Sequence, residues 1–273
     1  MATFLKKLSE ETRNNLIEDY KNNLSIRQLS DKYGVCRKSI SNFLSECGEK
    51  TQERNHYRKY FHKEDYFSII NTEEKAYWLG FMYADGYIIN HDELYGQDKV
   101  GITLSSVDIN HLEKFKISIQ ATNPITDVSR GNSKLSRILL TSQKTANDLI
   151  NAGCVKNKTF LLQFPTEQQV PNKLLHHFIR GYFDGDGSIS SYMKGNYLDY
   201  HINIVGPYDF IIKLYHIYSI GGYFKDKRKE NSWYFSINGN QQIIMFYHWL
   251  YDDATIFLQR KYDKFQELIN KYA

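Results

Sequence analysis

The chain has 273 residues, of which 41% are hydrophobic and 24% are charged, and it contains only four prolines. These values are typical of an ordered globular protein and exclude a disordered or fibrous one, and the length predicts about two domains. Residues 1–64 contain 13 Lys and Arg against 9 Asp and Glu, which is the whole net charge of +4, whereas residues 65–273 contain 22 of each. A surplus this small does not by itself indicate a nucleic-acid partner.

Cysteine content and apolar runs exclude several further classes. Cys36, Cys47 and Cys154 are odd in number and form no CxxC pair, which argues against a disulfide framework or a cysteine zinc site. The first residues lack the apolar core of a secretory signal, and the longest apolar stretch, Ile243–Tyr251, is too short to cross a bilayer. We therefore expect an intracellular, soluble protein with no membrane segment.

Residues 1–48 are predicted to form a small all-α domain with a helix-turn-helix. Ser25 and Gln28 have the spacing of a capping box, and Gly34 can end the short helix that they begin. The next helix has an apolar face and a polar face, an arrangement typical of the helix-turn-helix units of resolvases and transposases. Residues 49–64 are polar and are interpreted as a linker. The candidate DNA-binding residues on the polar face are Arg37, Lys38, Ser39, Ser41 and Asn42.

The larger part of the chain contains an internal repeat with an offset of 101 residues. Gly80 and Gly181 are separated by this offset, as are Asp85 and Asp186. The repeats are predicted to span residues 65–165 and 166–273. Asp108 and Asp209 keep the same offset, and each is expected to cap the helix that follows it.

Each repeat is predicted to be α+β, with a helix that ends in Asp-Gly, a strand, a helix that begins at Asp108 or Asp209, a β-hairpin and a closing helix, and the two copies are expected to pair with pseudo-twofold symmetry. The second pair of strands is expected at Ile125–Val128 with Arg137–Thr141, and at Gly222–Lys225 with Ser232–Asn238. Basic residues surround both turns and are interpreted as DNA contacts. They are Arg130, Lys134 and Arg137 in the first repeat, and Lys225, Lys227, Arg228 and Lys229 in the second.

Small residues four positions apart predict that the two motif helices meet. The pairs are Gly80 with Ala84, and Gly181 with Gly185, and such stripes allow two helix backbones to approach closely. Asp85 and Asp186 would then lie side by side at the ends of their helices.

Two carboxylates at helix C-termini repel the negative ends of the helix dipoles unless a cation lies between them. Hard oxygen ligands of this kind suit Mg²⁺, with Mn²⁺ as a substitute, and such a site can hydrolyse a phosphodiester. Lys158 and Lys261, late in each repeat, are candidates to hold the attacking water or to offset charge in the transition state. Asp184 is left out of the catalytic set because the first repeat has Tyr83 at the equivalent position.

The motifs at Trp78–Gly86 and Ile179–Gly187 resemble the two motifs of monomeric LAGLIDADG homing endonucleases. The segments Ala152–Lys158 and Leu258–Lys261 resemble the segments found late in each repeat of that family. The resemblance covers about residues 65–273. It implies two αββαββα repeats whose sheets form a saddle over a long DNA target, either pseudo-palindromic or asymmetric, that is bound by a monomer.

The resemblance also implies the site residues and the reaction. Asp85 and Asp186 would bind the metal, with the backbone carbonyls of Ala84 and Gly185 as further ligands. Members of the family cut both DNA strands across the minor groove and are encoded in mobile elements such as introns. This sequence departs from the usual motifs at Tyr83 and Arg180, neither of which removes a catalytic carboxylate.

Two alternatives to a magnesium-dependent, site-specific DNA endonuclease remain open. One is a non-catalytic DNA-binding regulator with the same fold, against which the presence of both acids argues. The other is an intron maturase that binds folded RNA, against which the helix-turn-helix argues.

Overall fold

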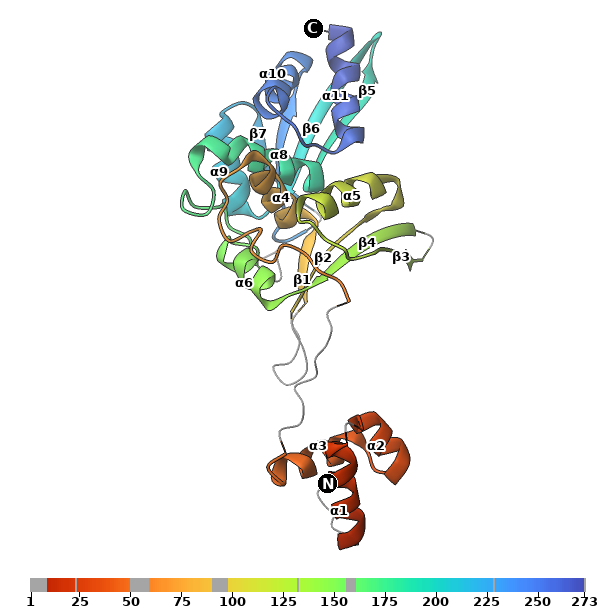
Figure 1. The fold of residues 1–273 in the computed structure, drawn as a ribbon. Coiled ribbons are helices and arrows are strands. Elements are labelled where there is room, and N and C mark those ends of the chain that lie inside the picture. The colour runs from red at the N-terminus through yellow and green to blue at the C-terminus, as the bar shows by residue number, and fades with distance from the viewer. Residues whose placement is uncertain are drawn as a thin grey trace. The chain divides into compact units, whose positions relative to one another are not determined.

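The computed structural model describes residues 9–22, 24–49, 59–89, 98–131, 133–155, 161–227 and 229–272. The chain divides into two compact units, residues 1–59 and residues 60–273. Figure 1 shows the helices and strands of both units. Among the described residues, no helix combines the length and apolar character that crossing a membrane requires.

The small unit consists of three helices, α1 (Glu10–Lys21), α2 (Ile26–Tyr33) and α3 (Arg37–Glu46). The capping box at the start of α2 is present, since Ser25 accepts from the Gln28 N–H while the Gln28 side chain accepts from the Ser25 N–H. Gly34 ends α2 in the left-handed region, with φ of +66°. The helices enclose a small apolar core formed by Leu16, Leu29, Val35, Ile40 and Leu44.

The first half of the larger unit has the predicted order of elements. It consists of α4 (Glu73–Ala84), β1 (Gly86–Ile89), β2 (Lys99–Ser105), a short 3₁₀ turn (Ser106–Asp108), α5 (Ile109–Ser118), β3 (Ile125–Arg130), β4 (Ser133–Thr141) and α6 (Gln143–Asn151). The four strands form an antiparallel sheet in the order β1-β2-β4-β3.

Among the described residues, the second half repeats this order and is followed by a further helix. It consists of a 3₁₀ turn (Asn172–Leu174), α8 (Leu175–Asp186), β5 (Gly187–Lys194), β6 (Tyr197–Gly206), α9 (Tyr208–Tyr218), β7 (Gly222–Lys225), β8 (Trp233–Asn238), α10 (Asn240–Tyr251) and α11 (Gln259–Tyr272). Its sheet has the matching order β5-β6-β8-β7. The predicted fold class, two matched α+β halves preceded by a small helical unit, is confirmed.

Each sheet packs one face on helices and leaves the other face open. Along β6, Tyr200, Ile202 and Ile204 are buried, whereas the alternating positions, such as Val205, are more exposed. Side chains alternate between the two faces of a strand, so the buried set lies on the helices and the other set on what we call the open face. The register extends this assignment across the sheet, because Ile204 pairs with the buried Phe235 of β8.

Two local predictions are wrong. Asp108 occupies the N-cap position of α5 but its side chain makes no cap hydrogen bond, and the N-cap of α9 is Pro207 rather than Asp209. Asp108 instead accepts two hydrogen bonds from Nε of Arg260, which joins the two halves. Asp209 lies inside the first turn of α9, which begins immediately after Pro207.

The end of the expected linker is part of the larger unit. The N–H of Lys63 donates to the carbonyl of Ile119, and the N–H of Thr122 donates to the carbonyl of Phe61. Residues 61–64 are therefore held against the first half, whereas residues 50–58 of the expected linker lie outside the described part of the chain.

Candidate functional site

Helices α4 and α8 pack directly against each other at the centre of the larger unit (Figure 1). A Cβ atom added to Gly80 would lie 1.9 Å from the carbonyl oxygen of Phe178, and one added to Gly181 would lie 1.9 Å from that of Tyr77. No real Cβ approaches an oxygen so closely. The two glycines therefore bring the backbones of the two helices into contact.

The same contact continues to the ends of the helices. A Cβ atom added to Gly185 would lie 2.3 Å from Cβ of Ala84 and 3.3 Å from Oδ2 of Asp85. Asp85 is the C-cap of α4 and is half-buried, and Asp186 is the last residue of α8 and is exposed. Both motifs thus end at one place, with the Asp85 carboxylate beside the backbone of α8.

The charges of both acids act on the same buried neighbour. Burial raises the pKa of Tyr182 well above its usual range, and the Asp186 and Asp85 carboxylates add to that rise. The Tyr182 hydroxyl donates to the carbonyl of Val205 at 2.8 Å. The end of the helix pair is therefore a region of concentrated negative charge.

Lys261 lies beneath this region and is only 3% exposed. Its Nζ donates to the carbonyl oxygens of Phe183 at 2.6 Å, Asp184 at 2.7 Å and Gly187 at 2.5 Å, and it lies 3.4 Å from that of Gly185. Burial lowers the pKa of Lys261 to about 8, against the opposing effect of the Asp184 carboxylate. Its predicted counterpart, Lys158, lies outside the described residues.

Asp184 of α8 is buried, and its carboxylate has three donors. Its carboxylate accepts from the hydroxyls of Tyr77 and Tyr251, each at 2.8 Å, and from the N–H of Leu258 at 2.7 Å. Burial raises the pKa of Asp184. An ionised carboxylate only accepts hydrogen bonds, so the three donors suit the ionised form of Asp184. An ammonium has three N–H groups, so the three close carbonyls suit the ionised form of Lys261.

The pairing of Arg180 with Glu73 could not be predicted from the sequence. Arg180 is fully buried, and its guanidinium donates to Glu73 at 2.6 Å and to the carbonyls of Leu250 and Ile256. This ion pair joins α8 to the start of α4. The signal in the sequence is the long charged side chain at a position where a small residue was expected.

The basic residues predicted to bind DNA occupy different faces. Arg137 of β4 pairs with Thr103 and alternates with the buried Ile138, so it lies on the open face of the first sheet. Lys134 is exposed nearby, whereas the side chain of Arg130 and the whole of residue Arg228 lie outside the described part. The second turn contains the exposed residues Lys225, Lys227 and Lys229.

The register places Lys225 away from the centre of the open face. Lys225 pairs with Trp233 in β8, and its neighbour Phe224 pairs with Tyr234. Because side chains alternate along a strand, Phe224 and Tyr234 point to the face opposite to that of Lys225 and Trp233. Phe224 is half exposed, and its ring lies 5.7 Å from that of Tyr234. The aromatic pair thus lies on the open face, and the lysine lies at the edge of the sheet.

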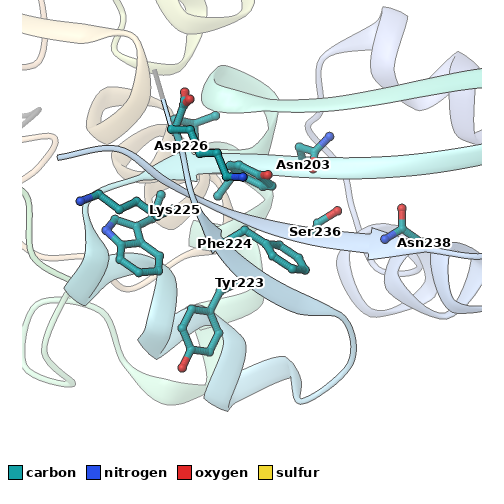
Figure 2. A pocket seen from close by; sticks show the side chains of 11 residues that line it. Asn203, Tyr223, Phe224, Lys225, Asp226, Ser236 and Asn238 are labelled. Carbon is teal, nitrogen blue, oxygen red and sulfur yellow. The ribbon is translucent and has the colours of Figure 1, made fainter. Parts of the chain in front are cut away.

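A groove of about 1290 Å³ is lined by β6, β7, β8 and the β7–β8 turn, and it includes Lys225 and Trp233 at the edge of the sheet as well as residues of the open face. Figure 2 shows Asn203, Ser236 and Asn238 on neighbouring strands of its lining. The register pairs Asn203 with Ser236, and His201 with Asn238. Amide and hydroxyl groups of this kind can contact base edges. These residues were not among the predicted DNA contacts, because the predictions relied on charge rather than on the alternation of side chains along the strands.

In the small unit, the predicted DNA-binding residues all lie on α3. Arg37, Lys38 and Asn42 are exposed, and Ser39 and Ser41 are half-buried. The polar face of α3 is thus presented outside the core of the unit.

A second group of potential metal ligands lies at the other end of α8. Nε2 of His176 lies 3.1 Å from the Asp253 carboxylate, and Nε2 of His177 lies 3.7 Å from it. However, Nδ1 of His177 lies 2.9 Å from Arg180, which can only donate, so in the neutral ring Nε2 carries the proton. Burial beside Arg180 lowers the pKa of His177 to about 4. The group therefore does not fit a metal site. The approach of Asp253 to the two histidines depends on tertiary structure and could not be predicted from spacing.

Comparison with solved structures identifies the fold. The meganuclease I-SmaMI bound to uncleavable DNA with a TTGT central four is similar with a TM-score of 0.51 and 14% identity, over 74% of this chain and 88% of that chain. The I-SmaMI LAGLIDADG homing endonuclease bound to cleaved DNA is similar with a TM-score of 0.50 and 16% identity, over 71% and 87% of the two chains. No family model and no curated protein matches the sequence. The larger unit thus has the fold of a LAGLIDADG homing endonuclease.

Proposed function

We propose that this protein is a metal-dependent endonuclease that cuts double-stranded DNA at a specific sequence and acts as a monomer. The observation that carries the proposal is the meeting of Asp85 and Asp186 at the ends of two helices in backbone contact. The similar structures are those of DNA-cutting enzymes. Mobile-element homing, as in the family that the motifs resemble, is the corresponding biological role.

The donor set fits a hard divalent cation. Two carboxylates and the carbonyls of Ala84 and Gly185 offer oxygen ligands, and the negative ends of two helix dipoles coincide there. Gly185 fits closely against Ala84 and Asp85, where a larger residue would separate the acids. Mg²⁺, or Mn²⁺ in its place, would supply an activated water and stabilisation of the leaving oxygen.

The residues of this chain hold and orient that centre. The helix contact at Gly80 and Gly181 fixes the separation of Asp85 and Asp186. The buried ammonium of Lys261 places a positive charge close to both acids, which offsets charge that develops on a phosphodiester during the reaction. Lys158 is proposed for the same role in the first half.

The open faces of the two sheets are proposed to bind the duplex. Arg137 on the first sheet and the exposed lysines at the β7–β8 turn would contact phosphates. Asn203, Ser236 and Asn238, which line the groove in Figure 2, would contact base edges. The polar residues are thus central, and the lysines of the second sheet are peripheral.

The decisive experiment replaces each acid with its amide. Asp85→Asn and Asp186→Asn should abolish cleavage of a randomised duplex library in Mg²⁺ while DNA binding is retained, because the amides keep the shape and lose the charge that holds the cation. Asp263→Asn, on the surface of α11, is the matched control and should cut normally. Full cutting by either acid variant would refute the mechanism.

The same assay separates the alternatives. A non-catalytic regulator would bind selected duplexes and cut none of them with or without Mg²⁺. A maturase would prefer folded RNA in a competition between RNA and duplex DNA.

We further propose that the small unit extends the DNA footprint through α3. The exposed Arg37 and Lys38 side chains suit phosphates, and Asn42 on the same helix suits a base edge. Replacing both basic residues with Gln should weaken binding and reduce the slope of log affinity against log salt by about 0.9 for each lost phosphate contact. Lys32→Gln, at the end of α2, is the control, and an equal loss in that variant would contradict a specific role for α3.

A further inference from the structure

We propose that Lys261 is a positioning residue that caps the C-terminal turn of α8 and so fixes the backbone that carries Asp186. The expected effect on cleavage rests on the proposed nuclease function, whereas the contacts of Lys261 with α8 do not depend on it. An ammonium has three N–H groups, and the three shortest contacts of Nζ are with the carbonyls of Phe183, Asp184 and Gly187. The protons of Lys261 are therefore matched by backbone oxygens, and a water or phosphate would have to displace one of them.

Lys261 provides hydrogen-bond donors for carbonyls at the C-terminal end of α8. The last carbonyls of a helix have no partner within the helix, and the strand β5 begins at Gly187, immediately after Asp186. The N–H of Gly187 donates to the carbonyl of Phe183, which also accepts from Lys261. One cation thus joins carbonyls on both sides of Asp186 and holds the turn between helix and strand.

The contacts leave the carbonyl of Gly185 as the weakest partner. It lies 3.4 Å from Nζ, whereas the other three lie at 2.5 to 2.7 Å. The carbonyl proposed as a metal ligand is thus the one that Lys261 binds least. Lys261 therefore makes its longest hydrogen bond to the carbonyl that is proposed to bind the metal.

The buried carboxylate of Asp184 holds the backbone at the start of α11, which carries Lys261. Asp184 accepts from the N–H of Leu258, and the carbonyl of Leu258 accepts from the N–H of Lys261. The Tyr77 hydroxyl of α4 donates to the same carboxylate, so both halves contribute to the support. The first half has Tyr83 at the position equivalent to Asp184, and its hydroxyl donates to the carbonyl of Ala152. The first half therefore has no carboxylate at this position.

The test compares Lys261→Met, which keeps the length and removes the charge and donors, with Lys264→Met, a half-exposed lysine on the same helix whose Nζ pairs with Glu267. Hydrogen exchange is measured over residues 181–190 in protein freed of metal by a chelator. We expect faster exchange in this segment for Lys261→Met alone. At saturating duplex, single-turnover cleavage should slow about a hundredfold, since misplacement of a reacting group by about 1 Å has that effect, with the dissociation constant for DNA within about twofold of wild type.

Tyr83→Phe controls for a general loss of stability, because it removes a buried hydrogen bond at the equivalent position of the first half. It should unfold more easily and yet keep wild-type exchange over residues 181–190. If Lys261→Met does not fold, Lys261→Gln, whose amide keeps two N–H groups, should give an intermediate rate and intermediate exchange. Wild-type exchange and rate in the Lys261 variants would overturn the proposal. Absence of cleavage by the wild type would refute the nuclease function, while the exchange data would still decide the cap.

Discussion

Substitution of Gly181 by Ala tests the contact between the two motif helices. The added Cβ would lie 1.9 Å from the carbonyl oxygen of Tyr77, and ordinary contact begins at 3.4 Å, so the helices would have to separate by about 1.5 Å. Alanine in a helix interior normally stabilises by about 1 kcal/mol relative to glycine. Overpacking normally costs about 1–3 kcal/mol, and here the obstacle is backbone, which cannot rotate away. We expect a net loss of about 2 kcal/mol.

Tryptophan fluorescence during urea unfolding measures this loss in the full chain. All three tryptophans, Trp78, Trp233 and Trp249, lie in the larger unit, so the small unit does not contribute. A loss of about 2 kcal/mol should lower the urea midpoint by about 1 M. Gly222→Ala is the control, because its Cβ would meet only the ring end of Phe224, at 3.1 Å. Equal midpoints for the two variants would refute direct backbone contact.

Three further predictions concern stability. Arg180→Met should destabilise the larger unit by about 3–5 kcal/mol, since it leaves Glu73 and two carbonyls without their buried donor; a urea midpoint within experimental error of wild type would contradict this. Burial lowers the pKa of His111 from 6.5 to about 3, so the stability that its neutral form contributes is present above pH 6.5 and is lost as the pH falls towards 3. The free energy of unfolding should therefore fall by about 1.4 kcal/mol per pH unit below pH 6 from this group, and His111→Gln should flatten the curve. Gly34→Ala should destabilise the small unit by about 1 kcal/mol because of its positive φ, and circular dichroism of its separate melting transition would measure this.

The sequence was sufficient for the parts of the site that depend on backbone geometry. A glycine is required wherever two backbones touch, so Gly80 and Gly181 mark the contact, and their constant offset marks the duplication. The positions of Asp85 and Asp186 could be predicted from the same offset, because each residue lies at the end of its helix. The alternation of apolar and polar side chains along β6 and β8 is also visible in the sequence. Which of the two faces is open, however, depends on the face that the helices cover.

Contacts between distant side chains could not be predicted in this way. The N–H of Leu258 reaches Asp184 across 74 positions, and Arg180 reaches Glu73 across 107 positions. No local periodicity signals such partners, because each depends on how loops close around the helix pair. The error at Asp108 has the same origin, since a distant Arg260 competes with the local N–H groups for its carboxylate.

The limit of the internal symmetry has a physical cause. At the equivalent positions 83 and 184, a neutral donor stands in one half and a charged acceptor in the other, and both are buried. Tyr83 needs an acceptor, which the carbonyl of Ala152 provides, whereas Asp184 needs donors and a nearby cation, which Leu258 and Lys261 provide. Backbone contact requires the same residues on both helices, but each buried polar group must be satisfied by its own surroundings. The two halves are therefore alike along the helix contact and different at positions 83 and 184.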